Sequence, residues 1–411
     1  MMSESRELIL KFALVALIVA TAFALISSRE FYTNSMLASF MAVAIGSVVF
    51  IHLSIRPLGD LSKVALITAA LVVIQCRVLR VVPHWPAVVC ILGIASFLVL
   101  GGHSMWASGK ERETAFCALI AGGLLSFSDW TASSTLGWTE AVHPKTLDLF
   151  LYKFDCSLGF QPSFLIGQWF AKYGWLHLVC ILFYVALPVP LTLVFGQRLR
   201  RDGRAAMGVF WAFLVAGPAG VLLFNIFPAM GPNHVFSNFP AYPLPIGDVS
   251  RLALEPVRLP GFRNAIPSLH MTWALLAWWS ARDVPRWTRA IAVLFVIFTV
   301  LATLGTGEHY LVDLVVAFPF ALVLYAIFER NSSASVRRIA VTVGALTVCG
   351  WLLALTYADQ IFWVSLSVPW LFVCGTLAVS LFFVHRLTLA EKSGETRLTE
   401  PQWQSIGVSA D

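Results

Sequence analysis

The sequence predicts an all-α fold, a polytopic transmembrane helical bundle of about twelve spans. Hydrophobic residues make up 58% of the 411 residues, charged residues only 12%, and the mean hydropathy is +0.80. A soluble protein carries about 25% charged residues. Apolar runs of about 20 residues, enough to cross a bilayer, recur along the chain. Backbone groups in lipid must be satisfied internally, and the alternating segments of a membrane barrel are absent, so the spans are helices.

The first apolar run, Leu8–Ile26, has a basic flank like that of a signal peptide. No small-residue cleavage site follows it and further spans do, so we interpret it as a retained helix. The expected spans lie near residues 8–27, 36–55, 62–81, 85–101, 113–128, 174–195, 206–227, 266–281, 287–305, 309–329, 338–356 and 361–384.

Two connections are long enough to hold structure of their own. The first, 129–173, contains Leu147–Lys172, whose apolar residues recur at helical spacing, and we expect an amphipathic, partly helical segment at the interface, broken near Gly159–Ser163. The second, 228–265, contains seven prolines and is expected to form a structured cap. The polar tail 391–411 is expected to be disordered.

Basic residues predict the orientation. If the N-terminus is cytoplasmic, most of the 28 Lys and Arg residues lie in connections on the cytoplasmic side. We therefore expect a multi-pass membrane protein (of the inner membrane in a bacterium) with both termini cytoplasmic. Because the Lys and Arg residues form short clusters between spans, the net charge of +6 does not indicate a nucleic-acid partner.

Three polar residues stand out at the ends of apolar spans. His270 begins the eighth span, and His309 and Asp313 begin the tenth. Two crossings separate them, so they are expected on the same side of the membrane, and the basic residues make that the outer or periplasmic side.

This trio suits phosphoryl transfer. His309 and Asp313 are four residues apart, hence on one helical face, and the carboxylate can fix the imidazole tautomer so that the other nitrogen is the nucleophile. His270 can protonate the leaving oxygen. Arg251, Arg258 and Arg263 lie on the same side, and Ser268 suits an N-cap whose neighbours face an anion.

Other interpretations stay open. Each histidine can be a structural hydrogen-bonding residue, the His/Asp pair can stabilise the bundle, and the trio can ligate a metal. A transporter with a His/Asp proton relay and a non-catalytic scaffold are the alternatives from other classes. We favour the phosphoryl-transfer site and expect no metal and no cofactor; the seven cysteines show no ligand or disulfide spacing.

The motifs resemble the type-2 phosphatidic acid phosphatase superfamily. Its Pro-Ser-x-His motif is similar to Pro267-Ser268-Leu269-His270, and its His-x-x-x-Asp ending to His309–Asp313. The resemblance implies that His270 is the general acid, His309 the nucleophile and Asp313 its partner. It covers roughly 113–330, a six-helix catalytic core, with transmembrane helices added at 1–112 and 331–390.

Two departures narrow the resemblance. Ala302-Thr303 stands where the family has Ser-Arg, and Phe227–Asn233 stands where it has Lys-x6-Arg-Pro. Together with the segment Phe160-Gln161-Pro162-Ser163, these two departures resemble the motifs of the inositol phosphorylceramide synthase branch of the superfamily. We expect Arg263 to replace the missing phosphate-binding Arg. The resemblance implies a lipid phosphatase or phosphotransferase acting on a lipid phosphate or phospholipid headgroup, with no obligate protein partner evident.

Overall fold

Helices form most of the described part of the chain. The computed structural model describes residues 35–56, 59–80, 82–251, 254–328 and 332–398. Over these ranges, the strands are β1 (Lys145–Thr146) and β2 (Val257–Arg258), which pair antiparallel with Lys145 opposite Arg258. The all-α bundle expected from the sequence is confirmed. The first expected span, 8–27, lies outside the described residues.

The helices follow one another with short connections except across the cap. Their bounds are α3 (Ser35–Gly46), α4 (Val48–Ile55), α5 (Leu61–Ile74), η1 (Gln75–Leu79), α6 (Trp85–Trp106), α7 (Gly109–Val142), α8 (Asp148–Ser157), α9 (Pro162–Lys172), α10 (Gly174–Val185), α11 (Pro188–Asp202), η2 (Gly203–Ala206), α12 (Met207–Ile226), α13 (Pro232–Val235), α14 (Ile246–Val249), α15 (Leu269–Ser280), α16 (Arg286–Gly305), α17 (Leu311–Phe328), α18 (Ala334–Tyr357), η3 (Asp359–Trp363) and α19 (Ser367–Leu398).

Seven segments in the described part of the chain are long and apolar enough to cross a membrane. They are Ala38–Ile55, Trp85–Trp106, Pro188–Ile226, Arg286–Gly305, Leu311–Phe328, Ala334–Tyr357 and Ser367–Leu389. Pro188–Ile226 holds both α11 and α12, which are joined by η2, beginning at Gly203 (φ 58°). The expected spans at 62–81, 174–195 and 266–281 are helical but short or interrupted, with 14 residues in α5 and 12 each in α10 and α15.

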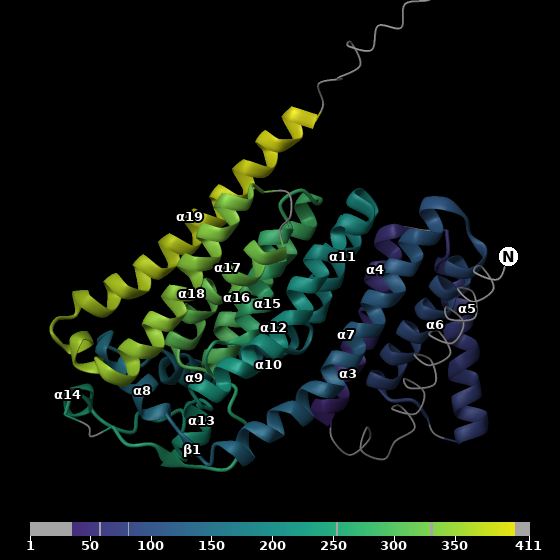
Figure 1. Ribbon diagram of the computed structural model, residues 1–411. Helices are drawn as coiled ribbons and strands as arrows, with labels where there is room; N and C mark the ends of the chain where they lie inside the picture. The colour runs from purple at the N-terminus through teal and green to yellow at the C-terminus, as the bar shows by residue number, and fades with distance from the viewer. Residues whose placement is uncertain (1–34, 57–58, 81, 252–253, 329–331, 399–411) are drawn as a thin grey trace, which may run out of the picture.

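α17 is the central helix of the C-terminal half, where it packs against α12, α15, α18 and α19 (Figure 1). Its most apolar window is 72% buried, against 28% for α18 and for α19, so the last two helices face outward. Gly344 of α18 sits against the carbonyl oxygen of Pro319 in α17, where an added Cβ would lie 2.9 Å away. A small residue here lets the two helices approach closely.

α8 differs from its sequence-based expectation. The segment is helical and breaks at Gly159 (φ 90°) before α9 begins, as expected. However, nine of its ten residues are buried, all except Leu149, and α8 packs against α17, α18 and η3. It therefore lies within the protein, because α17, α18 and η3 cover the apolar surface that otherwise indicates an interfacial helix.

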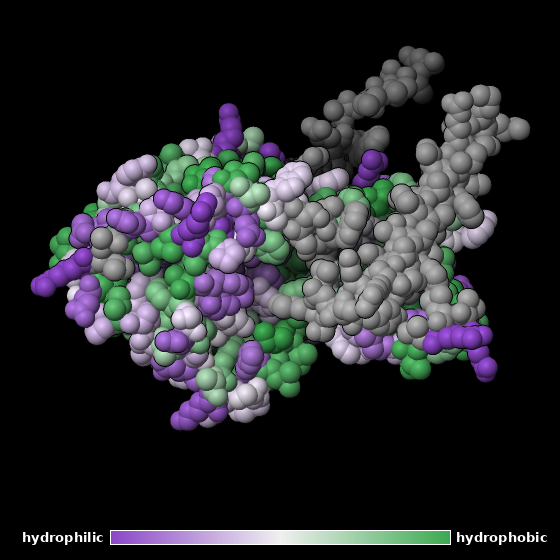
Figure 2. All heavy atoms as spheres, turned by 90° about the horizontal axis from the view of Figure 1, so that it is seen from below, coloured by the Kyte–Doolittle hydropathy of each residue, from purple (hydrophilic) through white to green (hydrophobic). Residues whose placement is uncertain are grey.

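The connection 228–265 forms the expected cap over one end of the bundle. It contains α13, α14 and β2, with β2 paired to the chain just before α8. Figure 1 shows α8, α13, α14 and β1 together at the lower end. Figure 2, viewed from that end, shows hydrophilic residues spread among smaller hydrophobic areas. This end has the mixed surface expected of a face in contact with water and lipid headgroups.

Two helices run further than the sequence predicts. α7 continues to Val142, well into the connection expected to begin at 129, and its 34 residues span about 51 Å. α19 continues to Leu398, past the start of the tail expected to be disordered at 391. Residues 399–411 lie outside the described residues.

Candidate active site

The His/Asp pair forms at the start of α17. The Nδ1 atom of His309 lies 3.3 Å from Oδ2 of Asp313, and the same oxygen accepts a hydrogen bond from the backbone N–H of Tyr310 at 2.8 Å. Both side chains are buried. His309 lies two residues before the first residue of α17 rather than inside the helix as the spacing predicts. The contact still forms because Asp313 lies in the first turn and points back towards the residues before it.

The two sequence motifs meet in space. The backbone N–H of Ser268 donates to the carbonyl oxygen of Asp313 at 3.1 Å, which joins the start of α15 to the first turn of α17. Ser268 is the N-cap of α15, as expected, and its hydroxyl oxygen accepts from the N–H of Met271 at 3.4 Å. These bonds place His270, in the first turn of α15, at the same end of the bundle as His309 and Asp313.

His270 is held by aromatic rings. Its imidazole stacks on Tyr184 of α10, with ring centroids 3.9 Å apart and an interplanar angle of 15°. Phe40 of α3 and Trp273 complete the surroundings at centroid distances of 6.3 and 6.2 Å. The ring orientation of His270 is therefore set by packing, and α3 from the N-terminal helices contributes to it.

Two carboxylates of α8 hold the backbone around the pair. Asp155 accepts from the N–H groups of Leu311 and Val312 at 2.7 and 3.2 Å, which caps the start of α17. Asp148 accepts from the N–H groups of Met230 at 3.1 Å and Gly231 at 2.9 Å. Burial raises the pKa of Asp155 to about 8 and that of Asp148 to about 6, although these hydrogen bonds favour the ionised forms.

Sequence reasoning missed both carboxylates as site residues. Asp148 and Asp155 are seven residues apart, or two helical turns, and therefore share one helix face. Two acids on one face of a mostly apolar helix are the signal that could have found them, because buried charge needs partners. Sequence reasoning also missed the contact of Ser163 in α9, whose hydroxyl donates to the carbonyl oxygen of His309 at 2.7 Å.

The cap contacts the residue before His309. Asn233 donates from its backbone N–H to the carbonyl oxygen of Gly307 at 3.0 Å and from Nδ2 to Oε1 of Glu308 at 2.9 Å. Nε2 of His234 lies 3.5 Å from Oε2 of Glu308. Gly231 has φ 130° and passes directly over the carbonyl oxygen of Glu308, where a Cβ would not fit.

These contacts set the charge next to His309. Burial opposes ionisation of Glu308, but hydrogen bonds from His234 and Asn233 outweigh it and lower the pKa of the carboxyl group. The hydrogen bond with Glu308 raises the pKa of His234, with burial opposing. The loop therefore presents a carboxylate and an imidazole beside the His/Asp pair.

Arg263 is placed differently from its expected role. It is fully buried, and its guanidinium donates to the carbonyl oxygens of His143 (2.8 Å), Leu259 (2.7 Å) and Gly261, and to the sulfur of Met230 (3.2 Å). Its backbone N–H donates to Thr139 at 3.0 Å. Four of its five N–H groups are thus engaged, one with His143 after α7 and the others within the cap. Arg263 therefore holds the cap together and joins it to the end of α7, and is not free to bind phosphate.

Arg251 and Arg258 lie on the cap end, as expected, but the structure does not bring them to the trio. Both side chains are exposed, and no contact of either with His270, His309 or Asp313 is described. Over the described ranges, no group of three or more His, Cys, Asp and Glu side chains is arranged to hold a metal ion.

A comparison with known protein families finds a match to the part of the chain that contains the site. Residues 149–327 match the PAP2 superfamily. The matched region runs from α8 through α17 and contains His270, His309 and Asp313. The match supports the type-2 phosphatidic acid phosphatase superfamily, and with it a phosphoesterase of the lipid-phosphatase type. No curated protein and no solved structure matches the chain.

Proposed function

We propose that the PAP2-like region cleaves a phosphoester of a membrane lipid, with His309 as nucleophile, Asp313 as its partner and His270 as general acid. The observation that carries this proposal is the bond between Ser268 and Asp313, which brings the start of α15 and the start of α17 together at the cap end. The His309–Asp313 contact leaves Nε2 of His309 as the nitrogen available for attack.

The reaction proceeds in two steps. Nε2 of His309 attacks phosphorus, the bond between phosphorus and the leaving oxygen breaks, and His270 gives that oxygen its proton. Water or an alcohol then attacks the phosphohistidine, gives its proton to His270 and releases His309. Asp313 stabilises the imidazole as it gains positive charge.

Several groups on this end can hold the phosphate oxygens. The backbone N–H groups of Leu269 and His270 begin α15, and helix starts favour anions. Arg251 and Arg258 contribute positive charge to the same end of the molecule. With Arg263 engaged in the cap and Thr303 at the position of the missing Arg, we expect backbone N–H groups to have a larger share here than an arginine side chain.

Transfer of a headgroup from a phospholipid to a second lipid is the second candidate. The observation that favours it is Glu308, a carboxylate next to His309 with a lowered pKa. A fixed negative charge repels a doubly charged phosphate monoester more than a singly charged phosphodiester, and it can accept hydrogen bonds from headgroup hydroxyls. In this candidate His309 acts as general base on the acceptor hydroxyl, and no phosphoenzyme forms.

Purified protein in lipid vesicles tests the first candidate. We expect phosphate release from lipid phosphates, abolished by His309→Ala and reduced at least about a hundredfold by Asp313→Asn, since a positioned acid or base contributes about 10²–10⁴ in rate. Full activity in His309→Ala contradicts the proposal.

A trapping experiment separates the two candidates. An acid-labile phosphoenzyme that is lost in His309→Ala supports hydrolysis through phosphohistidine. Headgroup exchange between phospholipids with no trapped phosphoenzyme supports the transferase. In that case we expect Glu308→Gln to lower the rate of exchange. If the protein turns over no lipid but carries a proton-coupled flux that depends on Asp313, both enzymatic candidates are wrong and the transporter interpretation is favoured.

A further inference from the structure

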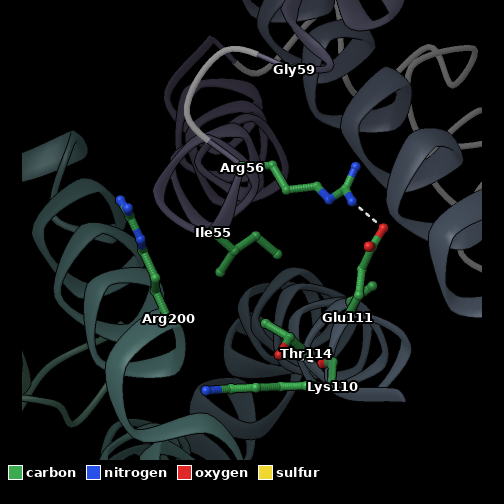
Figure 3. Close-up of a pocket in the computed structure, with 8 residues that line it drawn as sticks. Ile55, Arg56, Gly59, Lys110, Glu111, Thr114 and Arg200 are labelled. Carbon is green, nitrogen blue, oxygen red and sulfur yellow. Dashed lines mark hydrogen bonds and ion pairs between the residues drawn. The ribbon is translucent and has the colours of Figure 1, made fainter. Parts of the chain in front are cut away.

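A second polar site lies at the end of the bundle opposite the cap. A cavity of about 740 Å³ opens between α4, α7 and α11 (Figure 3). Its lining consists of Ile55, Arg56, Gly59, Lys110, Glu111, Thr114, Ala115 and Arg200. The volume is in the range of small-molecule sites, about 300–1,000 Å³, so the cavity accommodates more than a single ion.

Its lining carries a surplus of positive charge. Three basic side chains line the cavity, Arg56, Lys110 and Arg200, against one acid, Glu111. Arg56 pairs with Glu111 and, from Nη1, with Oδ2 of Asp60 at 3.2 Å. In the described part of the chain no ion pair of Lys110 or Arg200 is found, and Figure 3 shows them on facing helices, with Lys110 extending from α7 towards α11.

A buried carboxylate fixes Arg56 at the cavity wall. Asp60 is 1% exposed and binds Nζ of Lys63 and Nε2 of His103, each at 2.7 Å. Burial opposes its ionisation, yet the hydrogen bonds from Lys63, Arg56 and His103 hold the pKa of Asp60 below its ordinary value. Asp60 therefore stays charged and keeps the Arg56 guanidinium in place before any ligand arrives.

Glu111 is the replaceable member of this network. Its side chain is 45% exposed and pairs with Arg56 and, at 3.2 Å, with Nδ1 of His103, and exposed ion pairs contribute little to stability. A ligand anion can take its place on Nη2 of Arg56 at small cost. Guanidinium groups match phosphate geometry with two parallel hydrogen bonds, and Lys110 and Arg200 supply the remaining charge.

We propose that this cavity binds a phosphate-bearing anion, contacted by Arg56, Lys110 and Arg200. The same chemistry is offered by an anionic phospholipid headgroup of the adjoining leaflet and by a soluble phosphate ester. The cavity is separated from His270, His309 and Asp313 by the length of the bundle, so this site is independent of the proposed reaction.

Two binding measurements on the full chain test the proposal, both in the His309→Ala background so that no probe is consumed. Native mass spectrometry measures retention of phosphatidylglycerol against phosphatidylcholine with the same acyl chains, and calorimetry in neutral detergent measures binding of glycerol 3-phosphate. The cavity variant is Lys110→Gln with Arg200→Gln. The control is Arg201→Gln with Arg338→Gln, which removes two exposed charges that do not line the cavity.

We expect the cavity variant to weaken binding of at least one probe by about tenfold or more, and the control to leave it unchanged. Loss confined to phosphatidylglycerol identifies a lipid headgroup as the ligand, and loss confined to glycerol 3-phosphate identifies a soluble ester. Equal effects of the two double variants, or no binding of either probe to the parent chain, overturn the proposal, because the basic residues then serve only to orient the protein in the membrane.

Discussion

At His309, a single side-chain contact decides which ring nitrogen is available for chemistry. Asp313 takes Nδ1, while the backbone around the imidazole is held by Ser163 on its carbonyl oxygen and by Thr303, whose carbonyl oxygen accepts from the His309 N–H at 3.2 Å. The imidazole is thus fixed from three elements, α9, α16 and α17. Such fixing lowers the entropy lost when the reacting atoms are aligned.

Arg263 gives a prediction that separates two roles. If Arg263 binds phosphate, Arg263→Met raises KM strongly and leaves the fold unchanged. Its carbonyl contacts predict the opposite: the variant leaves the buried carbonyl oxygens of His143 and Leu259 without their donors, which costs about 1–3 kcal/mol of stability for each. Thermal unfolding with parallel kinetics checks this. A raised KM without loss of stability instead supports the phosphate-binding role that the sequence predicts for Arg263.

Asp155 predicts a pH dependence of stability. Its pKa is raised from an unfolded value of about 3.9 to about 8 in the folded protein, so folding favours the protonated form. This contribution is full below pH about 4 and is lost as the pH rises towards 8. We expect the stability advantage of the parent chain over Asp155→Asn to shrink across that window in denaturant titrations. A difference independent of pH contradicts the assignment.

Among the elements, α15 positions His270 through its first turn. Ser268 caps the helix, and its backbone N–H reaches Asp313, so the same residue starts the helix and aligns it with α17. The π-stacking on Tyr184 then determines where the imidazole points. The position of His270 therefore depends on α10, α15 and α17 together.

Ser268→Ala tests this positioning against simple helix capping. Loss of an N-cap costs about 1 kcal/mol, and Ser333, the N-cap of α18, offers a matched control with the same type of bond. We expect both variants to lower stability and only Ser268→Ala to lower kcat. Ala keeps the backbone N–H that reaches Asp313, but loss of the cap loosens the first turn of α15, which carries His270. Equal kcat values in the two variants show that Ser268 acts only as a cap.

α8 shows why an apolar pattern alone is ambiguous. Its periodicity matches both an interfacial helix and a buried one, because both bury an apolar face. Trp351 of α18 decides the outcome: it packs edge-on to Phe154 of α8 at a centroid distance of 5.1 Å, and Lys153 pairs with Asp359 at 2.7 Å. The C-terminal helices thus support α8, and through Asp148 and Asp155 they support the site.

For the whole molecule, the arrangement of helices places the candidate active site and the basic cavity at opposite ends. The basic residues predict that the cap end faces the outside or periplasm. With this predicted orientation, we expect the proposed reaction to take its lipid from the outer leaflet and the cavity to adjoin the inner leaflet.

Cysteine labelling tests the orientation. Arg251→Cys lies on the cap end and Arg201→Cys on the opposite end, and both positions are exposed. We expect a membrane-impermeant maleimide added to intact cells to label Arg251→Cys above the background of the parent chain, and Arg201→Cys only after permeabilisation. The reverse pattern inverts the orientation and moves the proposed reaction to the cytoplasmic face.

The sequence by itself determined the all-α membrane class, the cap between α12 and α15, the N-cap at Ser268 and the pairing of His309 with Asp313. Apolar run length and proline content are local properties that survive in the fold. The contact between His309 and Asp313 also forms, although His309 precedes α17. Only the tertiary structure decided the roles of Arg263, Asp148, Asp155 and Glu308. Whether a charged side chain is free or engaged depends on neighbours distant in sequence, and His143, Gly231 and Leu311 reach these residues only after the helices have packed.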